Sequence, residues 1–178
     1  MATVGEASDT AAVAEAYFTA VGNRDLDGMA ALWEPGGVGE IHGLVELVAP
    51  VSYRAWFENL FQAVPEFKLE IVEIVSEGEK AAVRWHATGT FDGTARFEGL
   101  TPNGAKLDLT GCDVIAVRDG RLYRNDAYMN GAEMMRQLGA LPPAGSAAEN
   151  VLTAALNAKT RIFGWIAARR SSPGSHRQ

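Results

Sequence analysis

The stretch 106–128, KLDLTGCDVIAVRDGRLYRNDAY, constrains the fold more than any other part of the 178-residue chain. Apolar and polar residues alternate on both sides of Asp119-Gly120. An Asp-Gly pair between two alternating runs is a strong β-hairpin signal, because the tight turn needs positive φ angles. We therefore expect two long antiparallel strands here.

The second strand of this hairpin carries the first candidate for chemistry, Asp126. Strict alternation places four side chains of this strand on one face: Leu122, Arg124, Asp126 and Tyr128. Because Leu122 belongs in a core, Asp126 is expected to point toward a core or pocket. A carboxylate in such a place is costly unless it is paired or used, so Asp126 is the predicted general acid or base.

The rest of the chain predicts helices first and strands after. Helices are expected at about 9–21, 26–33 and 50–64, a short hairpin at 39–48, strands at 67–75, 80–91 and weakly at 96–100, and a short helix at 131–138. Hairpin turns between successive strands predict an antiparallel, strongly curved sheet. The predicted fold is an α+β cone: a curved sheet with N-terminal helices across its concave face, enclosing a pocket.

The predicted organisation is one main domain followed by a separate helix. We expect a disordered start at 1–8, the α+β domain at 9–141, a Pro- and Gly-containing linker at 142–146, a long helix at 147–170, and a disordered tail at 171–178. The apolar stripe of the long helix must pack on something. Both the domain itself and a second subunit remain open as its partner.

Composition narrows the function classes. A hydrophobic fraction of 47% suffices for a core, while the net charge of −6 gives no electrostatic case for binding nucleic acid or anionic membrane. No apolar run has the length of a membrane span, and the start of the chain resembles no secretory signal. The single cysteine, Cys112, excludes an internal disulfide and suits the cytoplasm. No nucleotide-binding loop or metal-type His/Cys cluster occurs, so we expect no metal site.

The strand VRWHATGTF holds a second polar set. Arg84 and His86 share one face, and Trp85 lies on the other. They face either solvent on the convex side, which spacing alone slightly favours, or the concavity beside Asp126. In the second case Arg84 would pair with Asp126 and hold it ionised, and His86 would exchange protons near neutral pH.

Other candidates come from single positions. Asp113 alternates with Ile115 and Val117, so it is either a second inward carboxylate or exposed by a bulge. His42, alone after a Gly-rich segment, is more often a surface residue than a catalyst. Tyr53 and Trp56 either cap the sheet or line a cavity for an apolar ligand. The predicted substrate contacts are Tyr17, Trp33, His42, Tyr53, Trp56, Tyr128 and Asn130.

Several motifs together resemble a known family. They are RWxATGTF, the turn PNG, DVxxVRDGRL and RQLG, within a region of resemblance spanning about 10–149. This region resembles the SnoaL-like polyketide cyclases, or ester cyclase group, of the nuclear transport factor two-like superfamily. The resemblance implies a cone-shaped fold with a deep hydrophobic pocket, a homodimer and no cofactor. It also implies a cyclase or isomerase that acts by acid/base catalysis on an apolar, carbonyl-bearing, polyketide-type small molecule.

The resemblance also bears on individual residues. The family's acid/base aspartate stands just before the last helix, where this chain has Asn130, and an amide cannot take a proton as a carboxylate can. Asp126 is therefore the replacement candidate. Related epoxide hydrolases use an Arg-x-Asp pair, which Arg84-Trp85-His86 resembles with His in place of Asp. The alternatives are an epoxide hydrolase-like enzyme, a non-catalytic protein that binds a hydrophobic small molecule, and a purely structural dimer.

Overall fold

The computed structural model describes the backbone of residues 4–170, with side chains from residue 10 to 161 and at 163. The chain divides into two compact units, Met1–Ala140 and Leu141–Gln178. The second unit contains α5 (Ala147–Arg170), the predicted long helix. The predicted tail at 171–178 lies outside the described residues. Within the described part of the chain, no helix combines the length and apolar character that crossing a membrane requires.

The described residues of the first unit form four helices: α1 (Val4–Gly22), α2 (Leu26–Ala31), α3 (Val51–Ala63) and α4 (Gly131–Gln137). The helix α1 begins before the predicted Asp9 or Thr10, so the expected disordered start does not hold from Val4 onward. Asp25 caps α2, since its side chain accepts a hydrogen bond from the Gly28 amide at 2.9 Å. Trp33, predicted at the end of this helix, instead begins the first strand.

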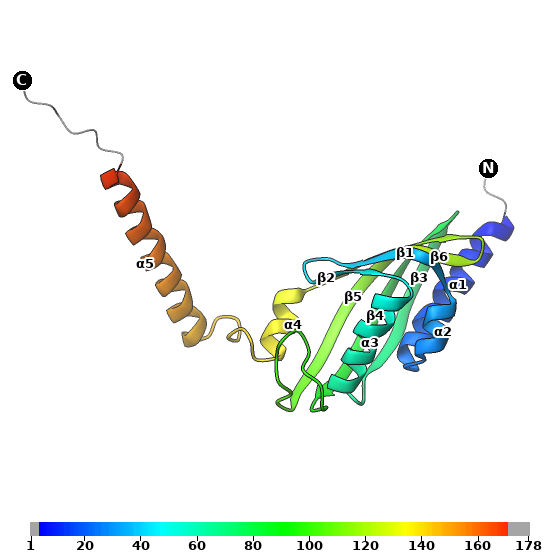
Figure 1. The fold of residues 1–178 in the computed structure, drawn as a ribbon, viewed down its shortest axis with the longest axis horizontal. Helices are drawn as coiled ribbons and strands as arrows, with labels where there is room; N and C mark the ends of the chain where they lie inside the picture. The colour runs from blue at the N-terminus through cyan, green and yellow to red at the C-terminus, as the bar shows by residue number, and fades with distance from the viewer. Residues whose placement is uncertain (1–3, 171–178) are drawn as a thin grey trace, which may run out of the picture. The chain divides into compact units, whose positions relative to one another are not determined.

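Six strands form one curved open sheet, in the order β2-β1-β6-β5-β4-β3 (Figure 1). The strands are β1 (Trp33–Ile41), β2 (Val45–Val48), β3 (Lys68–Glu77), β4 (Lys80–Phe91), β5 (Ala105–Arg118) and β6 (Arg121–Met129). The predicted α+β class is confirmed. The expectation of a wholly antiparallel sheet is wrong at one place, because β1 pairs with β6 in parallel. The weak strand predicted at 96–100 is only an isolated bridge between Phe97 and Leu100.

The predicted β5–β6 hairpin is confirmed, with φ angles of 50° at Asp119 and 70° at Gly120 in its turn. A register shift follows this turn, however. Val117 pairs with Leu122 but Ala116 pairs with Arg124, so β6 carries one extra residue, a β-bulge.

This bulge reverses which face the later residues of β6 occupy. Leu122 is fully buried, and the next buried residues are Asn125 and Ala127. Asp126 therefore lies on the face opposite Leu122, and Tyr128 on that face is 50% exposed. The prediction that Asp126 points with Leu122 toward the core is wrong, because alternation fails across a bulge.

The inner face of the sheet and the helices together surround the core. The helix α1 packs against β3, β4 and β5, and α3 packs against β2 and α2. Aromatic rings gather between them: Tyr17 lies edge-on to Trp33, and Tyr53 is tilted over Trp33 with ring centroids 4.7 Å apart. Between these helices and the sheet the packing leaves a cavity.

Candidate active site

The cavity offers about 100 Å³ to a water-sized molecule, within about 800 Å³ of empty space that includes the solvent at its mouth. Asp113 is the one side chain with an ionisable carboxyl among the described lining residues. The wall is otherwise mostly apolar and comprises Tyr17, Phe18, Val21, Ile41, Tyr53, Trp56, Phe57, Leu60, Phe67, Leu69, Trp85, Ala87, Phe97, Leu107, Leu109, Ala127, Met129, Met134 and Leu138. The predicted deep hydrophobic pocket is thus present.

Asp113 lies on the inner face of β5 and is only 5% exposed. The Trp85 indole Nε1–H donates to its Oδ1 at 2.7 Å, and the Asn125 side-chain amide donates to its Oδ2 at 2.8 Å. Gly111 leaves room for the indole, because a Cβ there would lie 2.2 Å from the Trp85 ring. Of the two alternatives for Asp113, the inward carboxylate is therefore the correct one.

Burial raises the pKa of Asp113 to about 6, against the stabilising hydrogen bonds from Trp85 and Asn125. The negative charge of Asp126, on the neighbouring strand, contributes to the rise. A carboxyl whose pKa lies this close to neutrality can both accept and return a proton under physiological conditions.

Two tyrosines lie beside this carboxyl. The Tyr53 hydroxyl accepts a hydrogen bond from the same Asn125 amide at 3.1 Å, which links it to Asp113. Tyr17 also lines the cavity and is 1% exposed. Burial raises the pKa of both Tyr17 and Tyr53, so both hydroxyls keep their protons at neutral pH.

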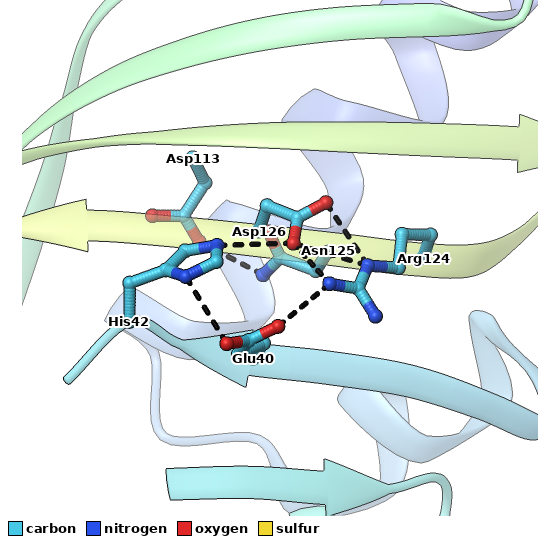
Figure 2. A network of polar contacts seen from close by, with 6 residues as sticks. All are labelled: Glu40, His42, Asp113, Arg124, Asn125 and Asp126. Atoms are coloured by element: carbon cyan, nitrogen blue, oxygen red, sulfur yellow. Dashed lines mark hydrogen bonds and ion pairs between the residues drawn. The ribbon is translucent and has the colours of Figure 1, made fainter. Parts of the chain in front are cut away.

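A second polar network lies on the other face of the sheet and contains the predicted catalyst Asp126 (Figure 2). The Arg124 guanidinium bonds both oxygens of Asp126 and also Glu40, at 2.8 Å. The His42 ring bridges the two carboxylates, with Nδ1 3.1 Å from Glu40 and Nε2 3.1 Å from Asp126. Arg124 lowers the pKa of Asp126, which suits a fixed ionic partner rather than a proton carrier at neutral pH.

Glu40, His42 and Asp126 also form a group that could hold a metal ion, with ligand atoms within 4.8 Å of one another. Sequence spacing does not predict this group, because Asp126 lies on β6 whereas Glu40 and His42 lie at and just after the end of β1, far away in the chain. The Arg124 guanidinium already pairs with both carboxylates, so a further cation would meet a like charge at this place, which disfavours it.

The predicted cluster of Arg84, His86 and Asp126 inside the cavity is wrong. Arg84 pairs with Glu73 at 3.5 Å and His86 with Asp108 at 2.7 Å, and neither basic side chain lines the cavity. They lie on the outer face of β4 because Trp85, between them, points inward. The comparison with an Arg-x-Asp pair fails for the same reason.

The predicted substrate contacts divide into two groups. Tyr17, Tyr53 and Trp56 line the cavity, whereas Trp33 is 2% exposed and lies behind the two tyrosines. The other three predicted contacts, His42, Tyr128 and Asn130, do not line the cavity. Tyr128 stacks on the His42 ring at 4.3 Å on the outer face. Asn130 caps α4 by accepting from the Glu133 amide at 3.1 Å.

Sequence reasoning missed two residues of the site, Trp85 and Asn125. Alternation along β4 correctly places Trp85 on the face opposite Arg84, but it does not indicate that the indole N–H donates to a carboxylate. The bulge that turns Asn125 inward has no sequence signal of its own. The sequence signal for Trp85 is its alternation with the apolar residues Val83 and Ala87, which places its ring on the inner face of the sheet.

The curved open sheet, the helices and the enclosed cavity define a cone of the nuclear transport factor two-like class. The model of the SnoaL-like domain family matches residues 14–125, more than half of the chain, so this chain belongs to the SnoaL-like family. Comparison with curated proteins gave no match.

Solved structures give the same fold. AclR from Streptomyces galilaeus superposes with a TM-score of 0.68 and 21% identity, covering 94% of this chain and 99% of that chain. A protein from Jannaschia sp. CCS1, named as a SnoaL-like polyketide cyclase, gives 0.70 and 19%, covering 80% and 99%. An LEH-like epoxide hydrolase of M. tuberculosis gives 0.61 and 18%, covering 76% and 92%. At these identities the similarity extends to the fold alone.

Proposed function

We propose that this protein is an acid/base enzyme, a cyclase or isomerase, that acts on an apolar, carbonyl-bearing small molecule with Asp113 as its proton carrier. The observation that supports this most is a buried carboxyl with a raised pKa in the wall of an otherwise apolar cavity. Names among the structural neighbours, which include polyketide cyclases, agree with such chemistry.

The proposed step is removal of a proton from the carbon next to a carbonyl. The C–H bond breaks, its proton goes to a carboxylate oxygen of Asp113, and its electron pair forms the C=C bond of an enolate whose oxygen takes the negative charge. Return of the proton to another carbon completes an isomerisation. Attack of the enolate carbon on a second carbonyl closes a ring, and the new alkoxide takes the proton back from Asp113.

The cavity wall also bears on the substrate class. No lysine or arginine is among the described lining residues, so a carboxylate or phosphate would enter this apolar space without a counter-charge, which is costly. We propose a neutral substrate of polyketide type, with binding driven by its apolar surface. The chemistry as written requires no cofactor.

The test uses 2-tetralone, an apolar ketone with acidic α-hydrogens, and measures its exchange of hydrogen for deuterium in D₂O by NMR. Asp113→Asn is expected to reduce the protein-catalysed exchange by at least about 100-fold, the usual contribution of a positioned base. Asp126→Asn is the matched control, a carboxyl on the adjacent strand that does not line the cavity, and it should retain the exchange within about threefold. Equal exchange by wild type and Asp113→Asn would refute the proposal.

A non-catalytic binding protein is the second candidate, favoured by the apolar lining of the cavity. It predicts that wild type binds 2-tetralone without accelerating its exchange. The homodimer implied by the resemblance belongs to the proposal as well, and light scattering of the whole chain tests it.

A further inference from the structure

The Asn125 side chain is buried beside Asp113 with one of its two polar atoms unpartnered. The residue is 1% exposed. Its Nδ2 donates to Asp113 Oδ2 at 2.8 Å (Figure 2) and to the Tyr53 hydroxyl oxygen at 3.1 Å. Within the part of the chain that the structure describes, its Oδ1 has no hydrogen-bond partner. A buried polar atom in this state is rare in native proteins and requires an explanation.

The sheet register holds Asn125 between the other two side chains. Asn125 pairs with Ile115 on β5, two positions from Asp113, so Asn125 and Asp113 are diagonal neighbours on the inner face. On its other side Asn125 pairs with Gly39 of β1. A Cβ at Gly39 would lie 2.1 Å from the Tyr53 ring, so the glycine lets this ring lie over the sheet and reach Asn125.

The Asp113 carboxyl has different hydrogen-bonding needs in its two protonation states. As a carboxylate it accepts from the Trp85 indole N–H at 2.7 Å and from the Asn125 amide. Once it takes a proton it is also a donor, and that donor needs an acceptor. An indole N–H can only donate. Of the two side chains that bond Asp113 in the described structure, Asn125 alone therefore carries an acceptor, its Oδ1.

An amide side chain can meet both needs by a half-turn about its Cβ–Cγ bond. The nitrogen and the oxygen of an amide are similar in size, so the turn exchanges them within the same space. The nitrogen carries two hydrogens and the oxygen two lone pairs, so either atom can serve the same two neighbours. Because a hydroxyl both donates and accepts, Tyr53 fits either orientation of Asn125.

We propose that Asn125 is a positioning residue whose side-chain amide reverses its orientation when Asp113 takes a proton. Beside the carboxylate, Nδ2 donates to Asp113 and Tyr53. Beside the protonated acid, Oδ1 takes this place and accepts from both. Asp113 then keeps its hydrogen bond to Asn125 in each state, so a proton can arrive and leave without leaving a buried donor unpaired. This inference deepens the proposed function and rests on it only for its part in turnover.

The other ionisable groups around Asp113 keep one protonation state through this change. Burial raises the pKa of Tyr17 on α1 and of Tyr53 on α3, so both hydroxyls stay protonated. The pKa of Asp126 on β6 is lowered by its hydrogen-bonded ion pair, so this carboxylate stays ionised. Burial raises the pKa of the Cys112 thiol, which stays protonated. Of these groups, Asp113 alone is expected to titrate between pH 4.5 and 7.5.

NMR of the wild-type protein tests the proposal directly. The ¹³C carboxyl signal of Asp113 reports its protonation, and NOEs from the Asn125 Nδ2 hydrogens to the Tyr53 ring report the orientation of the amide. We expect strong NOEs at pH 7.5 that disappear toward pH 4.5, with the same midpoint as the Asp113 signal. The Asn103 amide, which donates to the Leu138 carbonyl at 3.0 Å, is the internal control and should keep its NOEs. Asn125 NOEs of constant intensity, or an Asp113 signal that does not titrate in this range, would overturn the proposal.

A pair of variants gives a second, independent readout. Asn125→Leu has nearly the same size and removes both the donor and the acceptor, so the loss of one raises the Asp113 midpoint and the loss of the other lowers it. Trp85→Phe removes a donor alone and should raise this midpoint by roughly 1–2 pH units. We expect a smaller rise in Asn125→Leu. A rise as large as that in Trp85→Phe would mean that the amide only donates, which contradicts the proposal.

Both readouts follow the protonation of Asp113 without turnover. They therefore keep their meaning if the protein does not catalyse the exchange of 2-tetralone. Conversely, an amide that keeps one orientation leaves the role of Asp113 as the base to the exchange experiment with Asp113→Asn.

Discussion

Replacing Asp113 with Asn is expected to remove about 3 kcal/mol of pH dependence from the stability of the fold. The folded-state pKa of Asp113 is about 6, against an ordinary value of 3.8. Between these values the native state binds more protons than the unfolded state, so the free energy of unfolding falls as pH rises. A shift of one pKa unit corresponds to about 1.36 kcal/mol, so this shift corresponds to about 3 kcal/mol.

Urea unfolding of wild type and Asp113→Asn at pH values from 4 to 7.5 measures this difference. Subtracting the variant's free energy of unfolding from that of the wild type cancels the contributions of the other titrating groups. This difference should decline between pH 4 and pH 6 and level off above pH 6. Asp126→Asn provides a control whose difference should stay nearly flat between pH 4 and 7.5. Because Arg124 lowers the pKa of Asp126, the stability from that carboxylate is present above its ordinary pKa and is lost as pH falls. A flat difference for Asp113→Asn would contradict the buried, raised-pKa environment.

Trp85→Phe should shift the activity profile to higher pH. The Trp85 N–H stabilises the ionised form of Asp113 across 2.7 Å, so its loss raises the pKa of the carboxyl. Hydrogen bonds to charged groups contribute about 1.5–3 kcal/mol, which corresponds to an upward shift of roughly 1–2 pH units in the midpoint of 2-tetralone exchange. At pH 6 the exchange rate should fall about tenfold and then recover above the new midpoint.

That recovery distinguishes loss of a donor from loss of the fold. Trp56→Phe is the matched control, since Trp56 lines the same cavity but its indole N–H donates to Glu98 at 3.1 Å. Its midpoint should remain that of the wild type. An unshifted midpoint in Trp85→Phe would mean that the indole does not control the protonation of Asp113.

The architecture followed from the sequence because its signals are local. The Asp119-Gly120 turn predicts one hairpin, and the periodicity at Tyr53 and Phe57 predicts a helix with an aromatic buried face, as the structure has. The parallel pairing of β1 with β6 joins residues far apart in the chain. No local pattern encodes such a contact, so the sheet was predicted as antiparallel throughout.

The candidate site was predicted only in part, and the one extra residue at the β-bulge in β6 explains most of the error. Alternation gave the correct inward direction for Asp113, on the inner face of β5. The same rule applied across the bulge in β6 puts Asp126 inward, whereas the structure has Asn125 on the inner face. The position of the family's aspartate gave a second error. That position is Asn130 in this chain, and its side chain caps a helix.

The central claim, that Asp113 is a proton carrier in the wall of a ligand-binding cavity, is tested most directly by an NMR titration of the Asp113 carboxyl carbon. Protein labelled with ¹³C at the aspartate carboxyls would be titrated with and without 2-naphthol, which resembles the enol of 2-tetralone, using Asp113→Asn to assign the signal. The account predicts a midpoint near pH 6 that moves when 2-naphthol binds. A midpoint near the ordinary aspartate value of about 4, unaffected by the ligand, would contradict it.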